Sequence, residues 1–292
     1  MSGWRSVEAR AKVNLGLRIF APGADGYHPI ETLFCRIDLA DRLRIRLRAE
    51  PGVAIRVSGP QTAPQGPDNL AARAATLFLE RVGVAAGAEI ELEKHIPPGS
   101  GLGGGSSDAA AVLRVLADAV EAPPAPDEQL ALASRLGADV TFFAADMPLA
   151  FAWGRGERLQ ICHGLEPRPM LLVLPDVAIA TAEAYARWDE RAGDRGTVRA
   201  GPAGRPPVDV SSWERISAEA VNDFEPVIFS LRPDLRLLKQ RLSDTRPLIA
   251  LLSGSGAALF AVYESERQRD EAAAGLTDVV AGATVVSARG PV

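Results

Sequence analysis

Charged and apolar residues alternate along several stretches of the chain, and a period of two predicts β-strands with one buried face. The alternation runs through residues 5–20 and 36–58 and is clearest at 42–48, where arginines alternate with leucine and isoleucine. Residues 88–96 repeat it with glutamates on the polar side. Because no aromatic residues interleave with the arginines, we interpret them as the solvated face of an antiparallel sheet rather than as an RNA-binding stripe. Shorter apolar runs predict further strands at residues 170–174, 248–252, 258–263 and 283–288.

Longer segments that lack this alternation have the spacing and end signals of helices. Proline- and glycine-rich residues at 60–67 and 192–207 predict loops between elements, and the second loop is expected to be mobile. Strands and helices do not alternate regularly, and we see no internal repeat, so the pattern predicts an α+β fold. The predicted helices are Asn69–Val82, Ser106–Val120, Glu128–Leu136 with Asp127 as its N-cap, Glu183–Arg191 and Glu266–Ala274.

Composition narrows the class of protein. With 292 residues the chain can bury a large core and form two domains. A formal net charge of −5 argues against a nucleic-acid-binding surface. The chain has no apolar run of about 20 residues and no secretory signal pattern, so we expect a cytoplasmic protein without a membrane partner. Cys35 and Cys162 are too few for a disulfide framework, and the three histidines form no zinc motif with them.

The segment that carries the most chemical information is Pro97–Ala110, which follows the strand predicted at 88–96. Two prolines end the strand, five glycines follow, and a helix is predicted from Ser106. A flexible loop that leads into a helix N-terminus gathers unpaired N–H groups and the positive end of the helix dipole. Such a site suits phosphate.

Three interpretations of this loop can be compared from the residues alone. A Walker A loop requires a lysine after the glycines, and none is present. Gly99, Gly101 and Gly104 match the dinucleotide-binding pattern, but no strand ending in an acid follows about 20 residues later. A purely structural turn capped by Ser106 or Ser107 remains open, although glycine of this density destabilises a chain that does not use it.

The loop resembles the ATP-phosphate loop of the GHMP kinases. Two further segments match that superfamily in the same order, Ala9–Leu15 near the start of the chain and Leu252–Phe260 near its end. The resemblance implies a two-domain α+β fold with the active site in the interdomain cleft, an N-terminal domain at residues 1–158 and a C-terminal domain at 159–292. It also implies ATP with Mg²⁺ as cofactors. The residues expected to bind ATP are Asn69, Leu70, Lys94, Pro97, Gly99, Ser100, Gly101, Leu102, Gly103, Gly104, Gly105, Ser106 and Ser107.

The same resemblance implies the catalytic groups. Leu136–Phe143 is similar to a segment whose aspartate is the catalytic base in one branch of these kinases, which makes Asp139 the candidate; Thr141 replaces the usual proline. Lys12 lies in an apolar strand, where a lysine needs an anionic partner, and the resemblance makes that partner Asp139. The resemblance also implies that Ser107 reaches a magnesium ion or the β-phosphate. Asn14 lies two residues after Lys12 and therefore on the same strand face.

Gly23–Phe34 is typical of the GHMP kinases that phosphorylate a cytidine diphosphate-linked methylerythritol in the non-mevalonate isoprenoid pathway. Tyr27 offers a ring on which a pyrimidine can stack, and His28 offers polar groups for the edge of the base. Thr181 and Tyr185 match a segment that the family points into the substrate cleft, with Tyr185 as a second stacking ring. Asn222–Pro226 also resembles the family and is interpreted as mainly structural.

The sequence therefore predicts a kinase for a small cytidine-linked alcohol, acting as a monomer or a homodimer. Two alternatives stay open at this point. One is a sibling kinase acting on homoserine or mevalonate, and the other is a non-catalytic ligand sensor on the same fold. The joint presence of Lys12, Ser107 and Asp139 argues against the sensor, because a sensor need not keep the reacting groups.

Overall fold

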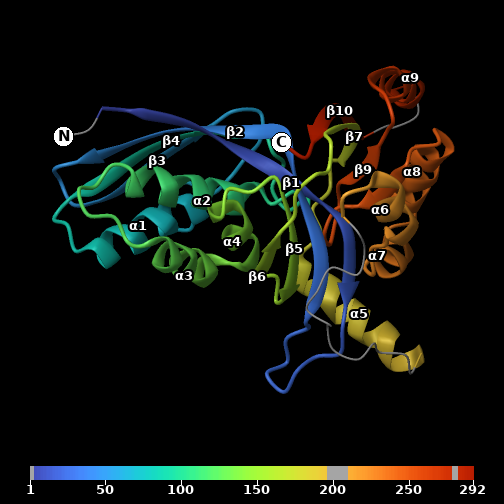
Figure 1. The fold of residues 1–292 in the computed structure, drawn as a ribbon, viewed down its shortest axis with the longest axis horizontal. Coiled ribbons are helices and arrows are strands. Elements are labelled where there is room, and N and C mark those ends of the chain that lie inside the picture. The colour runs from blue at the N-terminus through green and yellow to red at the C-terminus, as the bar shows by residue number, and fades with distance from the viewer. Residues whose placement is uncertain (1–2, 196–209, 278–281) are drawn as a thin grey trace. The chain divides into compact units, whose positions relative to one another are not determined.

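The computed structural model describes residues 3–195, 210–277 and 282–292, and it has the mixed α+β architecture that the sequence predicts (Figure 1). Its strands in chain order are β1 (Arg5–Ile19), β2 (Ile30–Arg48), β3 (Gly52–Ser58), β4 (Gly87–Glu93), β5 (Leu149–Gly154), β6 (Arg158–Ile161), β7 (Arg168–Pro175), β8 (Ile249–Leu252), β9 (Leu259–Val262) and β10 (Ala283–Gly290). Its helices are α1 (Leu70–Val82), α2 (Gly104–Ala117), α3 (Pro126–Leu136), α4 (Ala138–Ala144), α5 (Thr181–Arg195), α6 (Trp213–Glu219), α7 (Glu225–Leu231), α8 (Pro233–Asp244) and α9 (Glu266–Thr277).

The chain divides into two compact units, each built from several segments. Unit 1 comprises Met1–Ala11, Leu39–Pro98 and Gly103–Met147, and unit 2 comprises Lys12–Asp38, Gly99–Leu102 and Pro148–Val292. Strands β1 and β2 contribute residues to both units, and the glycine-rich loop is divided between them. The boundary that the sequence suggests at residue 158 between two family domains stays a prediction.

In unit 1, the second half of β2 pairs antiparallel with β4, and β3 pairs parallel with β4. Ile45 lies opposite Ile90, and both side chains are fully buried. On the other face Arg44 and Arg46 form ion pairs with Glu91 and Glu89 across the strands. The arginines of residues 42–48 are thus the solvated face of an antiparallel strand pair, as the alternation predicts.

Helices α1 to α4 of unit 1 pack on one another, and α1 also contacts β3 and β4 (Figure 1). The sequence did not predict α4, and it misplaced the start of α3, the end of β4 and the start of α2. Helix α3 begins at Pro126 with Ala125 as its N-cap, so the prediction that Asp127 is the cap is wrong. Proline fits the first helical position, and the Glu128 carboxylate accepts a hydrogen bond from the Ala125 N–H. Asp127 lies in the first turn instead.

The other two differences flank the glycine-rich loop. Strand β4 ends at Glu93. The Lys94 N–H still donates to the Ser58 carbonyl oxygen of β3, but the N–H groups of His95 and Ile96 donate to Asp41 Oδ1 instead of to a neighbouring strand. Helix α2 begins at Gly104 with Gly103 as its N-cap, two residues earlier than predicted. The cap that the structural-turn interpretation assigned to Ser106 or Ser107 is therefore not made.

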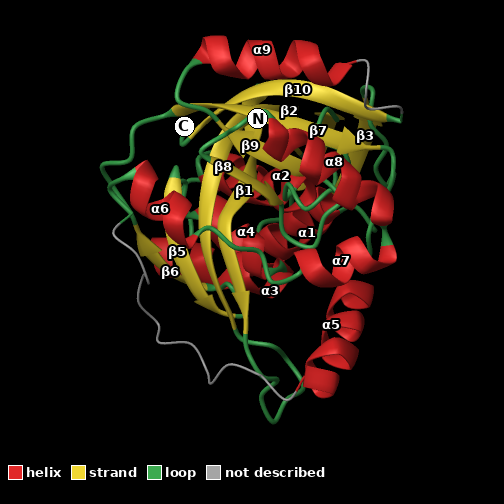
Figure 2. Ribbon diagram, turned by 90° about the vertical axis from the view of Figure 1, so that its right-hand side faces the viewer, coloured by secondary structure: helices red, strands yellow, loops and turns green. Residues whose placement is uncertain are grey.

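In unit 2, the strands β10, β7, β9 and β8 form an antiparallel sheet in that order, and helices α8 and α9 pack on it (Figure 2). Residues 170–173 of β7 are all buried, which explains why this strand reads as a continuous apolar run rather than as an alternation. The first half of β2 pairs with β5, and β5 pairs with β6. Helix α5 continues to Arg195, so the first residues of the loop predicted at 192–207 are helical, and its remainder lies outside the described residues.

Candidate active site

The structure distributes the predicted site residues over both units. The predicted residues that belong to unit 1 are Asn69, Leu70, Lys94, Pro97, Gly103, Gly104, Gly105, Ser106, Ser107 and Asp139. Those that belong to unit 2 are Lys12, Asn14, Tyr27, His28, Gly99, Ser100, Gly101, Leu102, Thr181 and Tyr185.

Lys12 is buried in unit 2, with only 3% of its surface exposed. Its ammonium donates hydrogen bonds to Asn14 Oδ1 at 2.8 Å and to the Gly101 carbonyl oxygen at 2.7 Å. A buried ammonium is stable only when it is hydrogen-bonded, and these two acceptors fix its position. The pairing of Lys12 with Asp139, which belongs to unit 1, stays a prediction.

Asn14 is itself held by a second bond that sets the orientation of its amide. Its Nδ2 donates to Thr32 Oγ1 at 2.7 Å, and Thr32 Oγ1 donates to the Gly16 carbonyl oxygen at 2.7 Å. With Nδ2 committed to Thr32, Oδ1 is the atom that remains for Lys12. The sequence reasoning missed Thr32. It lies inside the Gly23–Phe34 motif, so the motif included Thr32 but did not indicate that this residue orients Asn14.

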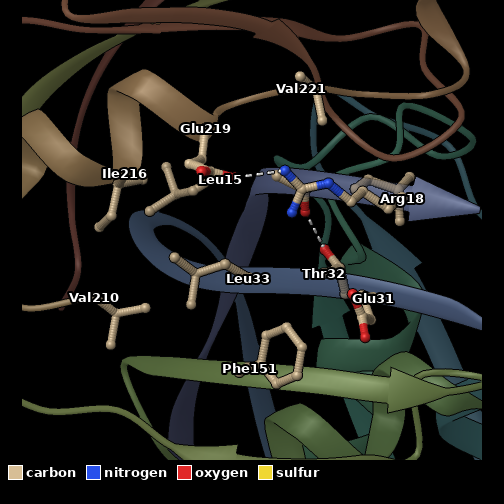
Figure 3. Close-up of a pocket in the computed structure, with 12 residues that line it drawn as sticks. Leu15, Arg18, Glu31, Thr32, Leu33, Phe151, Val210, Ile216, Glu219 and Val221 are labelled. Atoms are coloured by element: carbon tan, nitrogen blue, oxygen red, sulfur yellow. Dashed lines mark hydrogen bonds and ion pairs between the residues drawn. The ribbon is translucent and has the colours of Figure 1, made fainter. Parts of the chain in front are cut away.

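A pocket of unit 2 lies beside this chain of hydrogen bonds, and Thr32 is part of its wall. Figure 3 shows its lining, in which Leu33, Phe151 and Ile216 face the hollow while Arg18 forms an ion pair with Glu219 at 2.8 Å. None of its described lining residues is one that the sequence predicts for the site. The candidate site is therefore centred on Lys12 and not on this pocket.

The Gly99–Leu102 part of the glycine-rich loop is bonded to the Ser253–Ala258 turn within unit 2. Ser253 Oγ donates to the Gly101 carbonyl oxygen at 3.0 Å, and the Ala258 N–H donates to the Ser100 carbonyl oxygen at 3.0 Å. Gly101 has a φ of +80°, and a Cβ there would lie 1.9 Å from the Ser253 carbonyl oxygen. Only glycine can lie this close to Ser253, so the contact between the loop and the turn requires glycine at position 101.

Asn222 also fixes the backbone of this turn. Its side-chain amide donates to the carbonyl oxygens of Leu252 and Gly254, each at 2.8 Å, and its Oδ1 accepts from the Phe224 N–H. These contacts are consistent with the structural role proposed for Asn222–Pro226. The segment contributes to the site by fixing the backbone that contacts Gly101.

In unit 1, helix α2 begins at a glycine that has no side chain to cap it. Gly103 is the N-cap, with a φ of 74°. The first N–H groups of a helix have no partner within the helix, and a glycine N-cap offers them no side-chain acceptor. Ser107 in the first turn is buried. This is the arrangement in which a helix N-terminus binds phosphate.

A buried cluster of three charges supports this helix start. The Lys94 ammonium lies between the carboxylates of Asp41 and Asp108, forming an ion pair with each, at 2.9 Å from Asp108 Oδ2. It also lies under the helix start, since a Cβ on Gly104 would be 3.1 Å from Lys94 Nζ. The side chain predicted to bind ATP is thus engaged by two carboxylates.

The charges of this cluster shift the pKa values of its members. Burial raises the pKa of Asp108 to about 7, with Lys94 opposing the shift and Asp41 adding to it. Burial alone would lower the pKa of Lys94, but Asp108 and Asp41 outweigh it and raise that pKa. Lys94 therefore stays protonated and joins β2, through Asp41, to the first turns of α2, through Asp108.

Asp139 lies in the first turn of α4, which packs on α2 and α3. Its residue is partly exposed, whereas Val140 and Thr141 beside it are buried. A carboxylate is stabilised in the first turn of a helix by the dipole, so this position alone agrees with a structural role as well as a catalytic one. Asn69 is the N-cap of α1, and its Oδ1 accepts from the Ala71 N–H at 2.9 Å.

The predicted substrate residues His28, Tyr185 and Tyr27 of unit 2 all lie in aromatic contacts. The His28 ring stacks on Tyr185, with ring centroids 5.2 Å apart. Its ring nitrogens lie near the Phe20 carbonyl oxygen and the Asp189 carboxylate. Tyr27 is 57% exposed, and the Arg155 guanidinium covers one face of its ring. The sequence reasoning missed Arg155, which lies between Gly154 and Gly156.

Thr181 is the remaining predicted substrate residue of unit 2. Its Oγ1 lies 3.0 Å from Ser255 Oγ. The bond attaches the start of α5 to the Ser253–Ala258 turn, which also holds Gly101.

Two features of the described residues bear on what the protein can bind. No helix among them is long and apolar enough to cross a bilayer. Within the same residues, no group of three or more histidine, cysteine or acidic side chains is arranged to hold a metal ion.

Comparison with known proteins agrees with this geometry. The model for the GHMP kinases N terminal domain matches residues 69–147, and the model for the GHMP kinases C terminal matches residues 209–282. The 4-diphosphocytidyl-2-C-methyl-D-erythritol kinase of Methylacidiphilum infernorum is 38% identical over 263 residues, which cover 89% of this chain and 87% of the relative. The enzyme of the same name from Chlorobium limicola is 38% identical over 91% of each chain.

Solved structures of kinases also superpose on this chain. A crystal structure of 4-(cytidine 5'-diphospho)-2C-methyl-D-erythritol kinase superposes with a TM-score of 0.77 at 34% identity, covering 98% of this chain and 99% of that one. Homoserine kinase from Cytophaga hutchinsonii superposes with a TM-score of 0.69 over 98% of this chain and 95% of that one. At 19% identity it shares the fold alone.

Two glycines of the loop should respond in opposite ways to alanine. Gly101→Ala places a side chain against the Ser253 carbonyl at a positive φ, so we expect it to lower the free energy of unfolding by at least about 1–2 kcal/mol. A Cβ on Gly105 has no neighbour within 4 Å among the described residues, so Gly105→Ala should leave stability unchanged or raise it by about 0.5–1 kcal/mol. Denaturant unfolding of both variants checks this. Equal stability of the two would contradict it.

Removing one carboxylate of the Lys94 cluster should be costly. Asp41→Ala leaves the buried ammonium with one carboxylate fewer, and it leaves the N–H groups of His95 and Ile96 without their acceptor. We expect a loss of about 3–5 kcal/mol in the free energy of unfolding. The control is Glu80→Ala on the exposed side of α1, which should stay within about 0.5 kcal/mol of the parent protein. A loss below about 1 kcal/mol for Asp41→Ala would show that the cluster does not stabilise the fold.

Proposed function

The chain belongs to the GHMP kinases and, within them, to the family of 4-diphosphocytidyl-2-C-methyl-D-erythritol kinases, and from this membership we propose that it transfers the γ-phosphoryl group of ATP to the 2-hydroxyl of 4-diphosphocytidyl-2-C-methyl-D-erythritol. The observation that supports the proposal most directly is the bond between Lys12 and the Gly101 carbonyl. An ammonium suited to a developing alkoxide is thereby tied to the loop expected to carry the phosphates.

Phosphoryl transfer depends on positioning and on charge neutralisation more than on covalent chemistry. In the proposal, the N–H groups at the start of α2 bind the phosphates, with Ser106 and Ser107 in its first turn. Asn69 and Leu70, at the start of α1, lie near the adenine. Lys94 supports the helix start through Asp41 and Asp108.

The proposed base is Asp139. Its carboxylate accepts the proton of the substrate 2-hydroxyl as the oxygen attacks the γ-phosphorus, and the bond from that phosphorus to the oxygen of ADP breaks. Lys12 stabilises the negative charge that develops on the attacking oxygen, and Asn14 orients Lys12. General-base catalysis of this kind contributes about 10²–10⁴-fold to the rate.

The family's ATP chemistry calls for Mg²⁺, which takes oxygen ligands and few of them from the protein. The Ser107 hydroxyl in unit 1 is a donor of the right type. When bound, the ion would share the charge of the phosphates. We propose Ser107 as a protein ligand of the ion.

Residues of unit 2 would bind the cytidine end of the substrate. The exposed ring of Tyr27 is the proposed stacking surface for cytosine, with His28, Tyr185 and Thr181 beside it. We further propose that the enzyme works in the cytoplasm, as a monomer or a homodimer. The acidic composition and the absence of an apolar run of spanning length support the first part.

The direct test is phosphorus NMR of the purified protein with ATP, magnesium and the cytidine-linked methylerythritol. We expect a new phosphomonoester signal that grows in step with ADP and that is lost when EDTA removes the metal. ADP without this signal would mean that water or another alcohol accepts the phosphoryl group. No turnover in fresh, folded protein would contradict the proposal.

Asp139→Asn tests the assignment of the base. It keeps the size of the side chain but removes the acceptor for the proton, so we expect kcat to fall about 10²–10⁴-fold with little change in the unfolding midpoint. The matched control is Asp127→Asn, because Asp127 lies in the first turn of α3 as Asp139 lies in the first turn of α4. Near-normal kcat in Asp139→Asn would refute the role of Asp139, whereas an equal loss in both variants would indicate a structural effect.

A further inference from the structure

Tyr27 is unusual among the large apolar side chains of the described residues, because at 57% it is the most exposed. The position of its ring is nevertheless restricted by a contact with Arg155. The Cζ atom of Arg155 lies 3.8 Å from the ring centroid, well inside the range of a cation–π contact. One face of the ring is therefore occupied by a guanidinium from the turn that follows β5, 128 residues later in the chain.

Asp25 joins the two partners of this contact. Its Oδ1 accepts from the Tyr27 backbone N–H at 3.1 Å, and its Oδ2 accepts from Arg155 Nη2 at 2.5 Å. The Tyr27 N–H and Arg155 both lower the pKa of Asp25, so the carboxylate that joins them is ionised at neutral pH. One carboxylate thus fixes both the backbone that carries the ring and the cation that lies on it.

Both turns that bring these groups together have fixed backbones. The Gly23 N–H donates to the Tyr27 carbonyl oxygen at 2.9 Å, which closes the first turn. In the second, Arg155 lies between Gly154 and Gly156, which both have positive φ, and its own N–H donates to Glu157 Oε2 at 2.7 Å. The geometry of the contact therefore comes from the backbone, not only from two long side chains.

An exposed ion pair contributes little to stability, and Asp25 with Arg155 would form such a pair without any ring. The position of the guanidinium over the ring has a separate consequence. It covers one face of Tyr27, so a planar ligand can stack only on the opposite face. It also restricts the rotation of the ring, which reduces the entropy lost when a ligand stacks on it.

We propose that Arg155 is a positioning residue for the pyrimidine of the substrate: it holds the Tyr27 ring from one side so that the base stacks on the other. This inference rests on the proposed function, in which Tyr27 receives cytosine. Arg155 acts through Tyr27 and takes no part in the chemistry. Its effect should therefore appear in cytidine binding and not in the handling of ATP.

The first experiment compares Arg155→Met with the parent protein. Methionine keeps an unbranched stem but removes the cation. We expect the KM for the cytidine-linked substrate and the Kd of free cytidine diphosphate, measured by calorimetry, to rise about two- to fivefold, as exposed cation–π contacts allow. The kcat and the KM for ATP should stay within about twofold, because Arg155 touches neither in the proposal. Arg155→Lys, which keeps a cation, should recover part of the loss.

The matched control is Arg158→Met. Arg158 is an exposed arginine three residues further along, ion-paired with Glu157, and it should leave both constants unchanged. A loss in Arg158→Met equal to that in Arg155→Met would overturn the proposal, because it would reflect the general charge of this region. So would an unchanged KM in Arg155→Met.

A double-mutant cycle separates action through Tyr27 from direct contact with the ligand. In a Tyr27→Leu background, which lacks the ring, Arg155→Met should have no further effect on the Kd of cytidine diphosphate. An undiminished effect in that background would mean that Arg155 binds the ligand itself, and it would overturn the positioning role. If the parent protein neither binds cytidine diphosphate nor phosphorylates the substrate, the proposed function fails first. If it does both and only the Arg155 effects are missing, the inference alone fails.

Discussion

The arrangement of unit 2 around the candidate site depends on the burial of one ammonium group. Lys12 is surrounded by protein, and a buried cation must find hydrogen-bond acceptors or shed its proton. Gly101 supplies one of these acceptors, and its backbone reaches Lys12 because it has no side chain to collide with Ser253. Ser253 in turn lies in a turn whose carbonyls are fixed by Asn222. Each of these contacts is a condition for the next.

Unit 1 also contains a buried ammonium, that of Lys94, and stabilises it with ion pairs. Lys94 is as buried as Lys12, but it lies between two carboxylates, each of which forms an ion pair with it. Within unit 2, Lys12 instead donates to an amide oxygen and to a backbone carbonyl oxygen. The Lys94 ion pairs join β2 to α2 in unit 1, whereas the Lys12 bond to Gly101 joins β1 to the glycine-rich loop in unit 2.

Periodicity was sufficient to find most elements of the fold, because alternation and helical spacing are local properties. It missed β5, β6, α4, α6, α7 and α8, and it misplaced the ends of other elements. Strand β4 is shorter than predicted because Asp41, far away in the sequence, takes the N–H groups of His95 and Ile96. The start of α3 is set locally, since Pro126 takes the first helical position and Glu128 accepts from the Ala125 N–H.

The sequence also could not reveal which residues hold the candidate site in place. Motifs pointed to Lys12 and the glycines, but the partners that fix them lie far away in the sequence. Thr32 bonds Asn14 over 18 residues, and Ser253 bonds Gly101 over 152. Nothing in the residue types of such partners specifies the pairing, which only the folded chain creates.

The five glycines of the loop show how one sequence feature can have several physical causes. Gly99, Gly101 and Gly103 have positive φ, a conformation that other residues adopt only under strain. Gly101 and Gly104 are also pressed against neighbouring atoms, so a side chain there would displace backbone or Ile96. Gly105 has neither reason: its φ is not positive, and the described residues leave open space above it. Glycine in a helix start is unfavourable relative to alanine by about 0.5–1 kcal/mol. Folding does not require glycine at this position, and the proposed binding of phosphates at the start of α2 would account for it.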